Sequence, residues 1–307
     1  MSVVLNIDNI SKKIGQRQII KNLSLETNAG EVFGFLGPNG AGKTTTIRMI
    51  GGLSSITSGE ISVCGKCVQT NFEEALLNVG AIIEEPQLYR YMSGYDNLKY
   101  FASLYKGITK ADIDNMVERF GMSQRINTKV KTYSLGMRQR LGLIQALLHK
   151  PKLLILDEPT NGLDPSGIHE LRVFLRKLAA EEGVSVFVSS HILSEMQQMC
   201  DRVGIINQGT LISVNDISEI NAMSASTSKT QIQVDDTIKA AQILKEKMDV
   251  NVEINGSHVD ILIDRIEVPR AVNALVAGEI AIYAIDNNAS SSLENMYIKL
   301  TEGTEIE

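Results

Sequence analysis

Short apolar runs alternate with polar stretches along most of the chain, and their spacing indicates which elements form. Residues 3–36 are rich in strand signals, whereas residues 71–128 favour helices and loops. From residue 153 the order becomes strand, helix, strand, over residues 153–156, 167–180 and 184–188. Because strands that alternate with helices in this way pair in parallel, the pattern predicts an α/β fold with a parallel sheet.

A second pattern begins after a run of small and polar residues at 222–229, which predicts a linker. We therefore expect two domains, residues 1–222 and residues 229–307. The expected elements of the second domain are strand, helix, strand, strand, helix, strand and helix, over residues 230–234, 237–248, 250–254, 258–263, 269–276, 280–285 and 292–300. The first six predict a small α+β domain of the ferredoxin-like type.

Two local features of this second domain follow from the pattern. Its first helix is expected to place Ile238, Ala241 and Leu244 on one face. The two strands that follow are expected to form a hairpin around Asn255-Gly256, a favoured two-residue turn. No residue of the domain indicates a chemical role.

Composition and charge narrow the class of protein. The 307 residues are 43% hydrophobic and 21% charged, as in an ordinary globular protein. The net charge of −6 argues against a nucleic-acid partner, since such proteins carry a basic face. No apolar run approaches the roughly 20 residues of a membrane span, and the N-terminus lacks the pattern of a signal peptide. We therefore expect a cytoplasmic protein without a membrane span of its own.

The three cysteines offer little chemistry. Cys64 and Cys67 form a single C-x-x-C, and a zinc site would need a second Cys or His pair at ligand spacing, which does not follow. The surrounding segment favours a strand that runs into a glycine turn. Cys200 is expected to be buried as a small hydrophobic residue.

A glycine-rich segment, here called the phosphate loop, lies between an expected strand and an expected helix. It fits the pattern G-x-x-x-x-G-K-[ST] in the context that this pattern requires. Its glycines let backbone N–H groups approach phosphate oxygens, and the helix N-terminus favours negative charge. The lysine would contact the β- and γ-phosphates, and the threonine hydroxyl would bind Mg²⁺. The alternative is a glycine-rich turn without a ligand. The predicted ATP-binding residues are Gly37, Pro38, Asn39, Gly40, Ala41, Gly42, Lys43, Thr44 and Thr45.

Two carboxylates, Asp157 and Glu158, follow the apolar run at residues 153–156. Ligands of open α/β sheets bind at the carboxyl ends of strands. We therefore expect Asp157 to hold Mg²⁺ through water and Glu158 to act as the general base for the attacking water. The alternative is a strand that simply reaches solvent at two acids, and the phosphate loop makes this the weaker interpretation.

Three further segments narrow the choice among phosphate-loop ATPases. One segment, Tyr133-Ser134-Leu135-Gly136-Met137-Arg138-Gln139-Arg140, resembles the signature motif of ABC ATPases. Its Ser134 lies 23 residues before Asp157. Residues 161–165, Asn-Gly-Leu-Asp-Pro, resemble the D-loop of that family, and His191 resembles its switch histidine. All lie in ABC order, so residues 3–220 resemble an ABC ATPase.

The resemblance implies a P-loop NTPase fold of the ABC ATPase type, with a mixed sheet core and a helical subdomain. It also implies that Ser134 and Gly136 contact the ATP of a second subunit, so that a dimer, expected to be a homodimer, encloses two ATP molecules. His191 would contact the γ-phosphate and share a catalytic role with Glu158. Such a subunit implies an integral membrane permease as partner, which would hold the protein peripherally at the inner face of the cell membrane.

The sequence departs from the common family pattern at three places. In the signature motif, Leu135 and Met137 replace a glycine and a glutamine, while Ser134 and Gly136 remain. Glu84 stands where the family usually has a glutamine that touches Mg²⁺ and the attacking water. The resemblance therefore implies a carboxylate able to bind Mg²⁺ directly, and the alternative is an acid of a solvated loop.

The third departure concerns the nucleobase. The family often has an aromatic residue about thirty residues before the lysine of the phosphate loop, and Ile14 occupies that place here. An aliphatic side chain can pack on adenine, but it lacks the stacking geometry of a ring. We therefore expect weak selectivity between ATP and GTP.

A narrower resemblance comes from Glu84, the signature motif and residues 293–301, Leu-Glu-Asn-Met-Tyr-Ile-Lys-Leu-Thr. Together they resemble the bacterial exporters that protect against peptide antibiotics, bacitracin and lantibiotics among them. Two alternatives are non-transport ABC ATPases, of translation or of DNA maintenance. An ABC ATPase of translation usually carries two cassettes per chain, whereas each motif occurs once here. An ABC ATPase of DNA maintenance separates the phosphate loop from the signature motif by a long coiled coil. Here Lys43 and Ser134 are only 91 residues apart, without sustained heptads. A non-enzymatic binding module would be expected to lack the Glu158 carboxylate.

Overall fold

The computed structural model describes residues 2–219, 228–263 and 265–288. The chain folds into two compact units, Met1–Asn215 and Asp216–Glu307, and each unit has its own hydrophobic core. Most of the expected linker at 222–229 lies outside the described residues, so the proposed domain limits of 222 and 229 stay a prediction. The expected helix at 292–300 also lies outside them.

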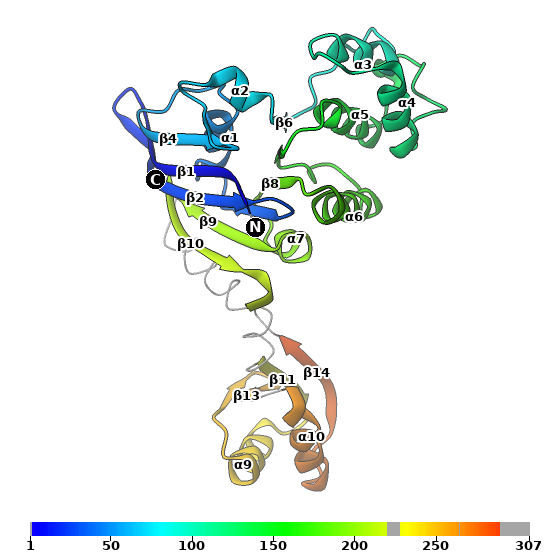
Figure 1. The fold of residues 1–307 in the computed structure, drawn as a ribbon. Helices are drawn as coiled ribbons and strands as arrows, with labels where there is room; N and C mark the ends of the chain where they lie inside the picture. The colour runs from blue at the N-terminus through cyan, green and yellow to red at the C-terminus, as the bar shows by residue number, and fades with distance from the viewer. Residues whose placement is uncertain (1, 220–227, 264, 289–307) are drawn as a thin grey trace. The chain divides into compact units, whose positions relative to one another are not determined.

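A six-stranded sheet forms the centre of the first unit (Figure 1). Its strand order is β10-β9-β3-β8-β7-β6, and the pairs β9–β3, β3–β8, β8–β7 and β7–β6 are parallel. The strands are β3 (Val32–Leu36), β6 (Val79–Ile82), β7 (Leu153–Asp157), β8 (Ser185–Ser190), β9 (Arg202–Asn207) and β10 (Thr210–Asp216). The predicted parallel sheet is thereby confirmed.

The central strands are apolar because both faces of the sheet are covered. Every residue of β3, β7 and β8 is buried, as expected for parallel strands packed on two sides. The rings of Phe33 and Phe35 lie 5.6 and 5.4 Å from the ring of Phe187, centroid to centroid, and form part of the core. Two helices, α6 (Pro165–Glu182) and α7 (Leu193–Met199), pack against β3 and β8.

The strand β6 was not among the strands expected from the sequence. It has only four residues and contains a glycine, which weakens the strand signal. A Cβ at Gly80 would lie 2.1 Å from the carbonyl oxygen of Ala146, so the glycine allows a helix to pack directly on this strand. That helix is α5 (Leu135–Leu147).

A four-stranded antiparallel sheet, of order β2-β1-β4-β5, lies beside the phosphate-loop helix α1 (Lys43–Ile50). Its strands are β1 (Val3–Ile14), β2 (Arg17–Asn28), β4 (Ser58–Val63) and β5 (Lys66–Cys67), and the short helix α2 (Phe72–Leu76) follows. Cys64 lies in the turn between β4 and β5, as expected, with φ of 49°. Cys200 is buried in the core, and burial raises the pKa of its thiol.

Three helices form the helical part of the first unit: α3 (Gly94–Ala102), α4 (Lys110–Arg119) and α5. Figure 1 shows them grouped together, apart from the antiparallel strands β1, β2 and β4. Each begins at a hydroxyl N-cap, which accepts a hydrogen bond from the first turn. The caps are Ser93, Thr109 and Ser134, and Thr109 forms a capping box with Asp112.

An aromatic stack joins this helical part to the sheet just before the loop that carries Glu84. The ring of His149, which follows α5, stacks on Tyr105 with centroids 4.3 Å apart. Nε2 of His149 donates to the carbonyl oxygen of Val79 on β6 at 3.1 Å. Burial lowers the pKa of His149, so the ring is neutral near pH 7 and Nε2 carries the proton that this bond needs.

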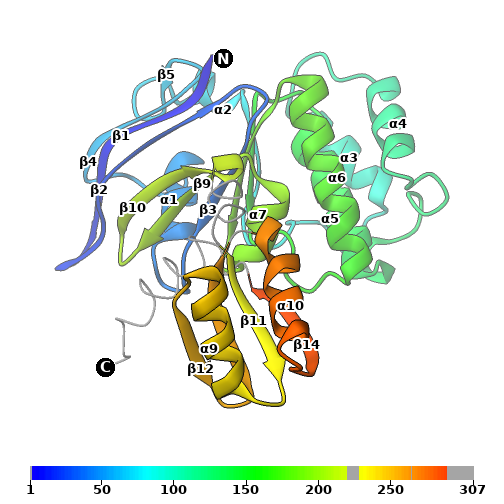
Figure 2. The same ribbon diagram turned by 90° about the horizontal axis from the view of Figure 1, so that it is seen from below.

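The second unit has the order β11-α9-β12-β13-α10-β14, which confirms the expected β-α-β-β-α-β pattern. Its antiparallel sheet has the order β12-β13-β11-β14. The two helices lie side by side against one face of this sheet (Figure 2). The elements are β11 (Ser228–Val234), α9 (Thr237–Met248), β12 (Val252–Asn255), β13 (His258–Ile263), α10 (Val268–Ala277) and β14 (Ile282–Asn288).

The three residues expected on one face of α9 differ in burial. Ala241 and Leu244 are buried, but Ile238 is 67% exposed. Ala240, which the pattern did not select, is buried in its place. Residues 240, 241 and 244 share one helix face at 100° per residue, whereas residue 238 lies outside this arc in the first turn.

Candidate nucleotide-binding site

The phosphate loop connects the buried end of β3 to the first turn of α1. Gly42 precedes the helix with φ of 109°, a conformation that residues with a side chain rarely adopt. The loop lines a pocket of about 310 Å³. The residues that line it are Ile19, Asn39, Gly40, Gly42, Lys43, Thr44, Thr45, Glu158, Asn161 and His191.

Lys43 is the positive charge of this pocket, although its side chain is only 6% exposed. Its Nζ donates to the carbonyl oxygens of Gly37 at 2.7 Å and Pro38 at 3.2 Å. The same nitrogen lies 3.2 Å from Oε1 of Glu158. The ammonium group therefore holds the phosphate loop in its curved shape and pairs with the proposed general base.

Asp157 and Glu158 leave the end of β7 in different directions. Asp157 is 2% exposed, and its two carboxylate oxygens accept from the hydroxyl groups of Thr44 at 2.9 Å and Ser189 at 2.6 Å. Glu158 has φ of 49°, a strained value for a residue with a side chain. Its backbone N–H donates to Oγ of Ser189 at 3.0 Å, and this bond helps to hold the turn.

His191 completes the cluster. Its Nδ1 lies 2.8 Å from Oε2 of Glu158, so the two carboxylate oxygens of Glu158 face a lysine and a histidine. The structure thus brings predicted residues of the phosphate loop together with Glu158 and His191 at one pocket, and Asp157 joins them through its bond to Thr44.

The oxygen donors of this cluster fit a magnesium ion. The hydroxyl of Thr44 and the carboxylate of Asp157 are hard ligands, and they lie side by side at the mouth of the phosphate loop. Mg²⁺ usually takes one or two protein oxygens and completes its shell with water and phosphate. Among the described residues, no group of three or more His, Cys, Asp or Glu side chains could hold a metal ion.

Glu84 and Ile14 are among the predicted site residues that do not line this pocket. Glu84 forms an ion pair with Arg48 of α1, with Nη2 and Oε1 2.6 Å apart, and does not line the pocket. Ile14 ends β1 and is 59% exposed. Their proposed roles, in metal binding and in base packing, therefore remain predictions.

Ile19 is a pocket residue that the sequence analysis missed. It lies on β2 next to Ile20, which is fully buried. Successive strand residues point to opposite faces, so the two adjacent isoleucines differ in burial, and Ile19 is only partly buried where it packs against the core. That alternation was the available signal for a side chain at this pocket.

The aliphatic character of Ile14 and Ile19 leads to a testable expectation. Neither side chain offers a ring to stack on a base or a polar group to read its edge. The affinities for ATP and GTP should therefore agree within about tenfold, roughly 1.4 kcal/mol. Competition of both nucleotides against one fluorescent analogue measures this ratio, and a hundredfold preference for ATP would contradict it.

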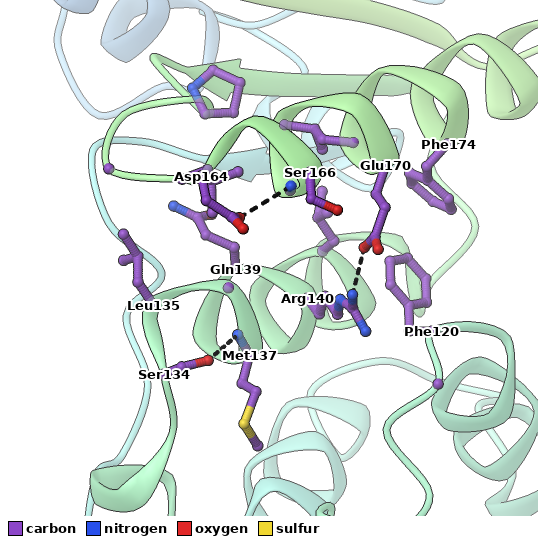
Figure 3. A pocket seen from close by; sticks show the side chains of 18 of the residues that line it. Phe120, Ser134, Leu135, Met137, Gln139, Arg140, Asp164, Ser166, Glu170 and Phe174 are labelled. Carbon is purple, nitrogen blue, oxygen red and sulfur yellow. Dashed lines mark hydrogen bonds and ion pairs between the residues drawn. The ribbon is translucent and has the colours of Figure 1, made fainter.

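A second cleft, of about 810 Å³, contains the signature residues (Figure 3). Ser134 caps α5, and its Oγ accepts from the N–H of Met137 at 3.3 Å. Across the cleft, Asp164 caps α6 and accepts from the N–H of Gly167 at 3.1 Å. Figure 3 also shows the side chain of Glu170 on α6 paired with Arg140 on α5. The signature and the D-loop thus face each other across this cleft.

Gly136 stands out within the signature. A Cβ built there would meet no atom within 4 Å, and its backbone φ is not positive. Neither packing nor conformation among the described residues therefore requires a glycine at this position. Ser134 and Gly136 line the large cleft and not the pocket of their own phosphate loop.

A partly buried carboxylate links the segment before the D-loop to the segment around the switch histidine. Oε2 of Glu195 accepts from the hydroxyls of Thr160 at 2.7 Å and Ser190 at 3.3 Å. Oγ of Ser190 in turn accepts from the N–H of Ile192 at 3.0 Å, one residue after His191. Nothing in the local sequence pattern pointed to Glu195, because its partner Thr160 is 35 residues away.

Comparison with known proteins places these features in a family. Residues 20–161 match the family model described as ABC transporter. The chain is 48% identical to an uncharacterized ABC transporter ATP-binding protein, YhcH of Bacillus subtilis, over 100% of this chain and 99% of that protein. It is 37% identical to the bacitracin transport ATP-binding protein BcrA of Bacillus licheniformis, over all of both chains.

A solved structure gives the same result at the level of the fold. The ATP-binding subunit of an ABC transporter matches with a TM-score of 0.65 and 28% identity, over 72% of this chain and 92% of that chain. Within the described part of the chain, no helix combines the length and apolar character that crossing a membrane requires.

Proposed function

Because this chain belongs to the family of ABC transporter ATP-binding subunits and is an ATPase, we propose that it energises the export of a peptide antibiotic of the bacitracin or lantibiotic type through a separate membrane permease. The similarity to BcrA along the whole chain supports the class of substrate. The observation that carries the enzymatic part is the cluster of Lys43, Thr44, Asp157, Glu158 and His191 around one pocket.

Each residue of the cluster has a role that its contacts support. Lys43 and the N–H groups of the phosphate loop bind the β- and γ-phosphates of ATP. Thr44 and Asp157 hold Mg²⁺, which supplies charge neutralisation on the phosphate oxygens. Glu158 orients the attacking water and accepts its proton, while His191 fixes the carboxylate through Oε2.

A second copy of the chain completes the site. The N-terminus of α5 at Ser134 presents backbone N–H groups and a positive helix dipole, which suit a phosphate. The open space at Gly136 leaves room for that phosphate to approach the backbone. Since neither residue faces its own phosphate loop, the phosphate belongs to the ATP of the partner subunit in a homodimer.

The location of this subunit in the cell follows from its proposed partner, the permease. We place the protein at the cytoplasmic face of the membrane, held there by the permease and without a nucleic-acid partner. The matching relatives and the matching solved structure are transporter subunits, which favours this function over that of an ABC ATPase in translation or DNA maintenance.

Purification of the complex from native membranes tests the proposal. The tagged chain should recover an integral membrane protein, and bacitracin should raise the ATPase rate of the purified complex. The same complex with Glu158→Gln is the control for contaminating ATPases. Recovery of ribosomes or DNA in place of a membrane protein would overturn the transporter, and a rate indifferent to peptide antibiotics would overturn the substrate class.

A further inference from the structure

An exposed ion pair connects the loop after β6 to the helix that follows the phosphate loop. Nη2 of Arg48 lies 2.6 Å from Oε1 of Glu84, and their side chains are 48% and 61% exposed. Pairs as exposed as this contribute little stability, so another cation can displace one partner at small cost. Glu84 also has φ of 65°, a strained conformation of the kind that concentrates at functional sites.

One face of α1 holds two carboxylates. Thr44 and Arg48 are four residues apart on this helix, so their side chains lie on the same face. Thr44 donates to Asp157, and Arg48 binds Glu84. Residues four apart differ by about one helical turn, which rises about 5.4 Å along the axis. The carboxylate of Glu84 is therefore bound on the helix face that carries Thr44, although Glu84 does not line the pocket that Thr44 lines.

The sheet brings the same two acids to one edge. Strands β6 and β7 pair in parallel, with Ile82 opposite Leu156. Glu84 follows Ile82 by two residues, and Asp157 follows Leu156 by one. Both carboxylates thus emerge from the carboxyl ends of neighbouring strands, where α/β sheets bind ligands.

We propose that Arg48 is a positioning residue that competes with the divalent cation for the carboxylate of Glu84. This rests on the proposed function, in which Thr44 and Asp157 hold Mg²⁺. Bound to Arg48, Glu84 stays outside the pocket that Thr44 lines. Released from Arg48, it provides a further hard oxygen donor at the cation site. The competition depends on charge, because a glutamine at this position would bind Arg48 only as a neutral amide.

The Mg²⁺ dependence of nucleotide binding tests this competition in the full chain. The measured quantity is the Mg²⁺ concentration at half-maximal binding of a non-hydrolysable ATP analogue. Arg48→Gln is expected to lower it by about two- to fivefold, the range of an exposed ion pair. Arg48→Lys should restore the wild-type value. Lys66→Gln breaks a similarly exposed pair with Glu74, at 49% and 58%, and should leave the value unchanged.

The Glu84→Gln background decides whether the effect passes through the carboxylate. There, adding Arg48→Gln should produce no further shift. An unchanged or raised Mg²⁺ requirement in Arg48→Gln overturns the proposal, and so does an equal shift in the Glu84→Gln background. If the wild-type chain fails to bind the analogue at any Mg²⁺ concentration, the proposed function fails, and this inference fails with it.

Discussion

Replacement of Glu158 by glutamine should lower ATP turnover by about 10²–10³-fold, the usual cost of removing one positioned catalytic group, while ATP binding persists. The amide has the shape of the carboxylate, so the strained turn at φ 49° and its support from Ser189 are retained. The amide cannot accept the proton of the attacking water. ATP binding persists because Lys43 and the phosphate loop are unchanged. The substitution also removes the negative charge of Glu158, whose Oε1 lies 3.2 Å from Nζ of Lys43.

Two measurements on the same preparation separate these effects. Phosphate release reports turnover, and equilibrium titration with a fluorescent ATP analogue reports affinity. Glu74→Gln, at an exposed acid of the ion pair with Lys66, is the control for loss of one negative charge. Turnover near that of the wild type in Glu158→Gln would show that another group acts as the base.

Replacement of Lys43 by alanine should act on binding itself. Its ammonium group is the positive charge at the centre of the pocket, and hydrogen bonds to charged groups contribute roughly 1.5–3 kcal/mol. The affinity for ATP should therefore fall by about tenfold to a hundredfold. The change also removes the two bonds from Nζ to the carbonyl oxygens of Gly37 and Pro38, so the phosphate loop loses its internal support.

Stability must be followed alongside affinity in this variant. The midpoint of thermal unfolding shows whether the fold is intact, and Lys66→Ala serves as the control at an exposed lysine. An affinity for ATP equal to that of the wild type in folded Lys43→Ala would refute the assigned role. The contrast with Glu158→Gln is diagnostic, because one change should weaken binding and the other should slow chemistry.

The parts of the site that could be predicted are those encoded by adjacent residues. The phosphate loop and the Asp157-Glu158 pair are continuous segments, and an apolar strand precedes each of them. A parallel sheet brings the carboxyl ends of its strands to one edge, so the meeting of these segments followed from the fold class. His191 was found only through its resemblance to a family, since a single histidine carries no pattern.

The remaining features depend on contacts between distant segments. The pairing of Arg48 with Glu84 joins residues 36 apart, and neither the helix pattern nor the loop composition indicates it. Glu195 likewise meets Thr160 only after α6 and β8 have folded between them. The exposure of Ile238 has a local cause. Residues spaced i, i+3, i+6, such as 238, 241 and 244, shift steadily around a helix, and the arc of buried residues is narrower than this shift.

The position of β3 in the sheet has a consequence for synthesis on the ribosome. Its neighbours β8 and β9 begin at residues 185 and 202, whereas β3 ends at residue 36. At about 5–20 residues per second, the roughly 150 residues between β3 and β8 take about 8–30 s to translate. The nascent chain therefore carries the segment that leads into the phosphate loop long before its neighbours exist, and any fragment that ends before Ser185 lacks both of them.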